Sequence, residues 1–255
     1  MTSSNPVQAA CRTLAIALAL AAGAAHGDAV LGFDVGAGSW QQALAGDLAT
    51  GADDVDLERD LGFDRERGNV YYGTLEHGVP FLPNLRLNRA DIDADGRDTL
   101  TRTLTFGGQT FSISEAVSAD VRLEQTDAVL YYELLDRGLS VDLGVAARWV
   151  DGAVSVVSAS GSGEAAFEGV IPLLYGRTRL DLPFSGLWLA AEASGIAYRG
   201  HSLLDASALL GWTSGVGLGA QLGWRTLRLE LDEVDEVERA DIDVSGPFLT
   251  LHFRF

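Results

Sequence analysis

Apolar and polar residues alternate along most of the chain after residue 30. The clearest run spans 139–150. Its odd positions, from Leu139 to Trp149, are apolar, whereas its even positions include Asp142 and Arg148. Successive side chains of a strand point to opposite faces, so this run predicts a strand with one lipid-compatible face and one polar face.

Ten segments of this kind are separated by turn signals, and each predicts a strand. They lie at 30–40, 68–77, 84–92, 120–135, 139–150, 166–180, 187–198, 203–213, 216–231 and 244–255. The connections alternate between short ones, at 78–83, 136–138, 181–186 and 214–215, and long ones, at 41–67, 93–119, 151–165 and 232–243. This alternation is typical of the periplasmic turns and extracellular loops of membrane barrels.

The chain has no apolar segment after residue 27 that is long enough for a membrane-spanning helix, so a membrane protein of this sequence must be a closed barrel. We therefore expect an all-β fold, a single antiparallel transmembrane β-barrel of about 10 strands, with its N- and C-termini both periplasmic. The segments Thr99–Phe106 and Gln109–Ser114 flank Gly107 and Gly108. They form either a projecting hairpin or two more barrel strands, so 8 or 12 strands remain alternatives.

Both ends of the chain indicate the compartment. Residues 13–22 form an apolar run behind Arg12, and small residues follow up to Gly27, which predicts a signal peptide at 1–27 and a barrel domain at 28–255. The single cysteine, Cys11, lies within that signal, so the exported domain has no thiol. The last eight residues, 248–255, alternate and stop on Phe255, which resembles the closing strand of bacterial outer-membrane barrels.

The net charge of −18, with arginine as the only strongly basic residue, argues against a nucleic-acid partner. The acidic residues concentrate in predicted loops, at 53–60 and 232–238 among others. Such loops are solvated, or they bridge to lipopolysaccharide through divalent cations.

One acidic segment resembles the opening of a calcium loop. Asp91, Asp93 and Asp95 stand at alternate positions ahead of Gly96, and carboxylates in this spacing can converge on one hard cation. The twelfth position is Arg102, where an EF-hand needs a bidentate glutamate. The alternative is an ordinary acidic turn, and calcium is the only cofactor that the sequence suggests.

Charged residues of both signs alternate onto the inward faces of the predicted strands. They are Asp34, Glu133, Asp142, Arg148, Glu192, Gln221 and Arg225, the glutamine being the one neutral member. In a narrow barrel such residues pair and fill the interior, and a solute path is the alternative. The register further predicts that Leu143→Arg disrupts folding, whereas the inward Gly144→Ser is tolerated.

An enzyme is the rival class of function. His201 and Asp205 lie near the predicted outer rim and could serve as a base and the group that orients it. No serine motif or pair of aspartates accompanies them, so we expect no catalytic residues.

Several segments resemble one family of predicted Gram-negative outer-membrane β-barrel proteins of unknown function. They are Glu76–Asn84, Leu130–Asp136, Leu139–Gly144 and Gly246–Phe248 with the aromatic tail, and Gly78 stands where a proline is expected. The resemblance covers most of the exported chain and implies a small barrel without naming an activity.

The sequence thus predicts an integral outer-membrane barrel with a structural role or a weak, porin-like role in small-solute passage. An outer-membrane protease or lipid A-modifying enzyme is the alternative. The expected partners are outer-membrane lipids, lipopolysaccharide and the barrel-assembly machinery, and the oligomeric state stays open.

Overall fold

The computed structural model describes residues 31–50, 53–56, 62–63, 65–79, 81–101, 103–136, 138–234 and 237–255, and these contain strands but no helix. No helix within these ranges could cross a membrane. The ten long strands are β1 (Leu31–Thr50), β3 (Glu66–His77), β4 (Asn84–Thr99), β7 (Ala116–Asp136), β8 (Leu139–Ser158), β9 (Ser162–Asp181), β10 (Leu187–Tyr198), β11 (His201–Thr213), β12 (Leu218–Val234) and β13 (Val237–Arg254). Three short strands are β2 (Asp53–Asp56), β5 (Leu104–Phe106) and β6 (Gln109–Phe111).

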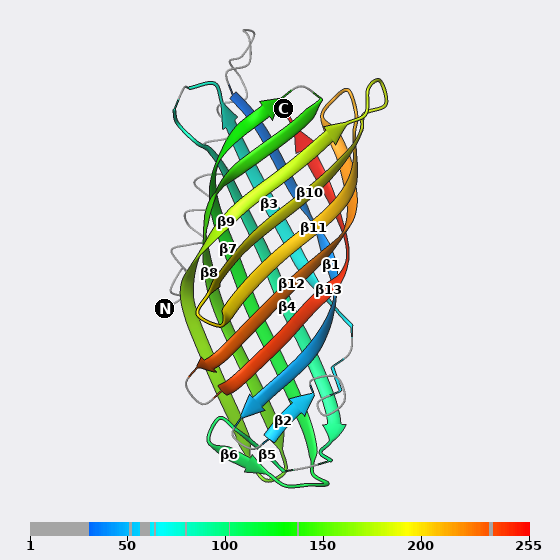
Figure 1. Ribbon diagram of the computed structural model, residues 1–255. Coiled ribbons are helices and arrows are strands. Elements are labelled where there is room, and N and C mark those ends of the chain that lie inside the picture. Colours follow the sequence, from blue (N-terminus) through cyan, green and yellow to red (C-terminus); the bar gives the residue numbers. More distant parts are fainter. Residues whose placement is uncertain are drawn as a thin grey trace, which may run out of the picture.

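The ten long strands form one closed antiparallel barrel (Figure 1). Each pairs with its neighbours in chain order, and β13 returns to pair with β1. Closure gives most membrane-level backbone groups a partner, which matters because lipid cannot satisfy such groups when they are left open. The predicted ten-stranded barrel, and the small barrel implied by the family resemblance, are confirmed.

The two ends of the barrel differ. Phe33 and Phe255 exchange backbone hydrogen bonds of 3.1 and 2.9 Å, so the start of β1 lies beside the end of β13. The turns between β3 and β4, β7 and β8, β9 and β10, and β11 and β12 lie at this end, which we call the short-turn end. The opposite end, where β8 and β9 meet, we call the hairpin end (Figure 1).

Most strands extend beyond their predicted limits at the hairpin end. β1 continues to Thr50, β4 to Thr99 and β8 to Ser158, so much of the expected long loops is strand. Apolar and polar residues still alternate there, but the apolar side chains now point into the lumen and the polar ones point outward. On β4, Ala90, Ile92 and Ala94 are buried inside, whereas the acidic residues between them face outward.

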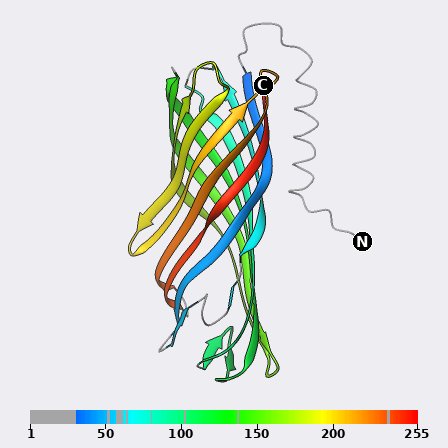
Figure 2. The same ribbon diagram turned by 90° about the vertical axis from the view of Figure 1, so that its right-hand side faces the viewer.

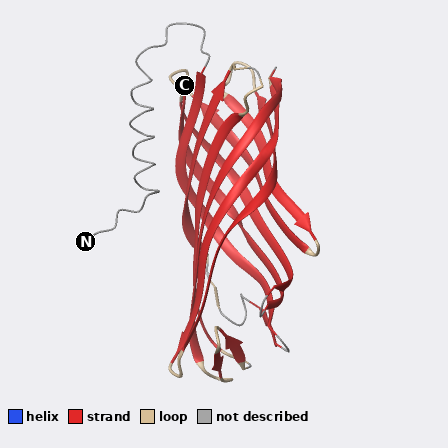
Figure 3. Cartoon of the chain, turned by 90° about the vertical axis from the view of Figure 1, so that its left-hand side faces the viewer, coloured by secondary structure: helices blue, strands red, loops and turns tan. Residues whose placement is uncertain are grey.

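The segment around 99–114 forms a separate two-stranded sheet, β5 and β6. Gly107 and Gly108 connect them with φ values of 58° and 75°, which the left-handed region permits best for glycine. The hairpin lies at the hairpin end (Figures 1 and 3), and the alternative of two further barrel strands is wrong.

An apolar band surrounds the short-turn half of the barrel. On β8 it runs from Leu139 to Trp149, roughly 33 Å along the strand and roughly 25 Å in height once strand tilt is included. Exposed aromatic residues border it: Tyr71, Tyr132, Trp149, Trp212 and Trp224. Four other aromatic residues are instead buried or half-buried in the lumen: Trp40, Tyr72, Tyr131 and Tyr175.

The register of β8 agrees with the sequence prediction, because Leu143 and Val145 are exposed while Asp142 and Arg148 are buried. The expectation for Gly144→Ser is wrong. A Cβ at Gly144 would collide with the Leu130 carbonyl oxygen and the Tyr131 backbone. Close strand approach, rather than lumen space, explains this glycine.

The predicted signal peptide at 1–27, Cys11 and Arg102 lie outside the described residues. So do most of the acidic side chains at 53–60 and all those at 232–238.

Candidate functional site

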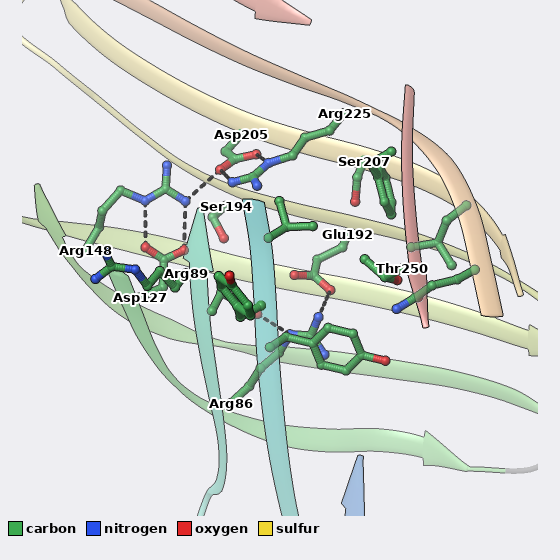
Figure 4. A pocket seen from close by; sticks show the side chains of 17 residues that line it. Arg86, Arg89, Asp127, Arg148, Glu192, Ser194, Asp205, Ser207, Arg225 and Thr250 are labelled. Atoms are coloured by element: carbon green, nitrogen blue, oxygen red, sulfur yellow. Dashed lines mark hydrogen bonds and ion pairs between the residues drawn. The ribbon is translucent and has the colours of Figure 1, made fainter. Parts of the chain in front are cut away.

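The lumen contains a buried network of two arginines and two aspartates. The guanidinium of Arg148, on β8, donates to both carboxylate oxygens of Asp127, on β7, at 2.7 and 2.8 Å. It also donates to Asp205, on β11, at 2.7 Å. Arg225, on β12, donates to the same Asp205 at 2.8 and 2.6 Å. We call these four residues the cross-lumen network, because they join β7 and β8 to β11 and β12 (Figure 4).

The cross-lumen network is almost free of solvent. Arg148 is 1% exposed, and both aspartates are buried. Ions removed from water require close partners and several hydrogen bonds, and bidentate guanidinium–carboxylate geometry provides both. Arg225 also lies over the Trp40 ring, 4.7 Å from its centroid. The network therefore occupies the lumen as a fixed polar layer.

A second group of polar residues lies nearer the short-turn end. Arg86 approaches Glu192 at 3.4 Å and donates to Thr74 at 3.1 Å. Its guanidinium lies 4.6 Å from the ring centroid of Tyr72, whose hydroxyl donates to Asp34 at 2.9 Å. These contacts connect β1, β3, β4 and β10 across the interior.

At the short-turn end, aromatic and basic side chains fill the lumen. Trp188 is 1% exposed, and Arg179 lies over its ring at 4.1 Å. The indole nitrogen donates to Thr213 at 3.1 Å, and that hydroxyl lies 3.0 Å from Nε2 of His252. A Cβ at Gly211 would overlap the Trp188 ring, so this glycine provides the space for the indole.

At the hairpin end the lumen is apolar. Buried residues from the barrel wall and from the β5–β6 hairpin pack together: Leu44, Phe63, Ile92, Ala94, Leu100, Leu104, Phe111, Val117, Ala119, Val156, Leu203, Leu227 and Val244. We call this set the apolar layer. Packed apolar side chains therefore occupy the lumen beyond the cross-lumen network.

A cavity of about 90 Å³ remains among the polar groups (Figure 4). Arg86, Arg148, Glu192, Gln221 and Thr250 contribute to its wall. Nη1 of Arg148 and Oγ1 of Thr250 are buried and have no protein partner. A polar cavity of this size holds a few water molecules, which would satisfy those atoms.

The structure places the predicted inward residues on the lumen face of their strands. Asp142, Arg148 and Gln221 are buried, and Asp34, Glu192 and Arg225 are partly buried. Glu133 stands directly opposite the inward Asp142 on β8, but it is exposed, close to a register shift between Glu133 and Leu135. The sequence did not single out Asp127 as the partner of Arg148. Their positions directly opposite each other on β7 and β8 provide the signal.

The three carboxylates of the calcium-like segment do not converge. Asp91, Asp93 and Asp95 lie on β4 rather than in a turn, all on its outward face. Alternate residues of a strand are roughly 7 Å apart, so Asp91 and Asp95 stand about 13 Å apart at the backbone. Asp91 instead pairs with Arg89 at 3.2 Å. Among the described residues, no group of three His, Cys, Asp or Glu side chains could hold a metal ion.

The structure does not bring His201 and Asp205 together as a catalytic pair. They are four residues apart on β11, which is roughly 13 Å along a strand. Asp205 is buried, and Arg148 and Arg225 occupy both of its oxygens. His201 stands beside the turn after β10. The carboxylate is therefore part of the cross-lumen network.

Neither a protein-family model nor a curated protein matches the chain. Solved structures with a similar fold include the translocator domain of the autotransporter NalP from Neisseria meningitidis, at 12% identity and TM-score 0.45, covering 98% of this chain and 97% of that one. Ail, the attachment invasion locus protein of Yersinia pestis, has 11% identity and TM-score 0.36, with 88% and 98% covered. The P. putida toluene transporter TodX has 8% identity and TM-score 0.29, with 90% and 91% covered. These likenesses concern the β-barrel fold alone.

Proposed function

We propose that the protein is an integral outer-membrane barrel with a closed lumen, and that its role is structural rather than that of an open pore. The observation that carries the proposal is the cross-lumen network, which fills the interior beneath the apolar layer. The apolar band and its aromatic borders support placement in a lipid bilayer.

In this proposal the short-turn end and both termini face the periplasm, and the hairpin end faces the outside. The predicted signal peptide exports the chain, the barrel-assembly machinery inserts it, and lipids and lipopolysaccharide surround it. No catalytic residue or resident cofactor is part of the proposal.

Membrane fractionation tests the location. We expect the exported protein in outer-membrane fractions. Because hydrogen bonds between β1 and β13 close the barrel, we also expect an altered gel mobility after boiling. Recovery in the soluble periplasmic fraction would contradict the proposal.

A narrow solute path is the second candidate, and the 90 Å³ cavity is the observation that favours it. Planar-bilayer recording separates the two. A closed barrel gives no steady current, whereas a narrow path gives a small one, which the acidic exterior would make cation-selective. A large steady conductance proportional to salt would instead make the protein a porin.

A further inference from the structure

The wall of the barrel has one long strand edge without a neighbour. β9 pairs with β8 from Ser162 to Leu180, but it pairs with β10 only from Leu174 to Asp181. The β10–β11 hairpin ends well before the β8–β9 hairpin and turns away from it (Figures 2 and 3). Within the described ranges, the other edge of β9 has no strand partner from Ser162 to Leu173.

The backbone of this edge is oriented by the ladder on its other side. In an antiparallel pair, the N–H and C=O groups of successive residues point alternately to the two neighbouring strands. The N–H of Asp181 bonds to Gly138, before β8, and that of Leu182 bonds to Leu187, on β10. Even-numbered residues of β9 therefore direct their backbone groups away from β8.

Pro172 explains why the β9–β10 ladder stops where it does. It is even-numbered and has no N–H, so it cannot donate toward β10. The last pair is Leu174 with Gly195. On the hairpin-end side of Pro172, the backbone N–H and C=O groups of three residues point to the open edge. These residues are Ala166, Glu168 and Val170. Near Ser162 the edge is covered, because Gly107 of the small hairpin lies against the Glu164 backbone.

The side chains that flank the edge differ between its two faces. Glu164 and Glu168 face outward, and Glu168 stands directly opposite Asp151 on β8. Carboxylates directly opposite each other repel, and none of these three has an ion-pair partner among the described residues. On the inner face, Phe167 is 49% exposed beside Gly169.

From this arrangement we infer that the edge of β9 at Ala166–Val170 binds an extended basic peptide segment, which adds as a strand to the barrel wall. Its backbone pairs with Ala166, Glu168 and Val170. Lysine or arginine at alternate positions lies beside Glu164 and Glu168, and the apolar residues between them pack on Phe167. A second copy of this chain is disfavoured, because pairing two such edges would bring their glutamates together.

Peptide binding to the folded protein in neutral detergent micelles tests the inference. The probe is a fluorescent peptide of alternating lysine and valine, and fluorescence anisotropy measures its binding at low salt. We expect saturable binding, and at least tenfold weaker binding of the same peptide with glutamate in place of lysine. No saturable binding, or equal binding of both peptides, would overturn the inference.

Two proline variants show whether the edge is the site. Ala166→Pro removes an edge N–H, should leave the pairing with β8 intact, and should weaken binding about tenfold. Ala166→Val keeps the N–H and should bind as the wild type does. Ala165→Pro removes a donor to β8 and should lower stability instead. Unchanged binding to a folded Ala166→Pro protein would exclude the edge.

Two further measurements test the role of charge and the identity of the added strand. The Glu164→Gln, Glu168→Gln protein should bind more weakly and with less dependence on salt, and unchanged binding would exclude recognition by charge. Sedimentation without peptide should show that the wild-type protein does not self-associate through this edge. Any self-association that is seen should therefore persist in the Ala166→Pro protein. Self-association that Ala166→Pro abolishes would assign the edge to a second copy and overturn the peptide proposal. None of these outcomes depends on whether the lumen conducts.

Discussion

Arg148 is the residue on which the lumen's internal order depends most. It starts on β8, bonds to Asp127 on the adjacent strand and reaches Asp205 on β11. One side chain thus joins neighbouring and opposing parts of the wall. Arg225 secures Asp205 from the other side, so each carboxylate is held by at least one guanidinium.

Removing Arg148 should therefore be costly. In Arg148→Met, Asp127 loses both of its guanidinium hydrogen bonds while remaining buried, and we expect the free energy of unfolding to fall by about 3–5 kcal/mol. Urea unfolding in lipid vesicles, followed by tryptophan fluorescence, measures this. Adding Asp127→Asn should recover part of the loss, because the uncompensated charge is removed.

The matched control is Arg89→Met, which breaks a 2.6 Å pair with Glu124 and a 3.2 Å pair with Asp91 on the outer face. Exposed pairs contribute about 1 kcal/mol or less. Similar losses in the two variants would show that burial does not make the cross-lumen network special.

Glu115 provides a prediction about pH at the hairpin end. Hydrogen bonds from Ser160, Ser158 and Ser112 lower the pKa of this exposed carboxyl to about 2. A lowered pKa stabilises the folded state above the ordinary value, and the contribution is lost as pH falls through the folded value. The Ser158–Gly161 turn should keep its contacts from neutral pH down to about pH 4 and lose them near pH 2.

An NMR titration of the Ser160 amide checks this, since that amide donates to Glu115 at 3.0 Å. Its resonance should titrate near pH 2 in the wild type and should not do so in Glu115→Gln. A midpoint near 4.5 would mean that the hydrogen bonds do not persist in solution.

Individual residues differ in how far the sequence reveals their contacts. Alternation alone identifies Arg148 and Asp142 as inward, because period two needs no knowledge of neighbours. Asp127 follows once β7 and β8 are aligned. Asp205 lies 57 positions from Arg148, and only closure of the barrel brings the two together.

The strands were easiest to predict where they cross the apolar band. There one face must be apolar and the other fills a polar lumen, so the pattern is clear. Beyond the band, water contacts the outside and apolar residues fill the inside. Asp91, Asp93 and Asp95 then resemble a loop although they belong to β4. A search for alternation of either sense would have found these extensions.

Because the outer surface changes from apolar to polar along β8, a substitution by arginine should have different costs at two outward positions of this strand. Leu143→Arg places a cation in the middle of the apolar band and should cost about 2–4 kcal/mol. Ser155→Arg is also outward but lies beyond the band, opposite Asp120 and Glu164, and should cost about 0–1 kcal/mol. Refolding yield and urea midpoints in vesicles compare the two. The reverse order would mean that the band is misplaced along the strand.

As a whole, the interior of the barrel is filled by two unrelated kinds of interaction. The cross-lumen network depends on paired charges, and the apolar layer depends on packing of side chains from the wall and the β5–β6 hairpin. A single substitution should therefore not open the lumen. This redundancy favours a role in which the barrel must stay sealed.

The last prediction separates these closures by removing each in turn. Arg148→Ala with Asp127→Ala opens the network. Replacing residues 101–113 by Asn-Gly removes the small hairpin, and the 2.8 Å bond from the Ser114 N–H to the Leu100 carbonyl suits a two-residue turn there. In the proposed closed lumen each layer blocks ions alone, so planar-bilayer recordings should show no steady conductance for the wild type or for either variant, after altered gel mobility has confirmed folding. Combining the changes should give a steady, salt-dependent current. A current from the hairpin variant alone would mean that the charged network is permeable and that the apolar layer is the only seal.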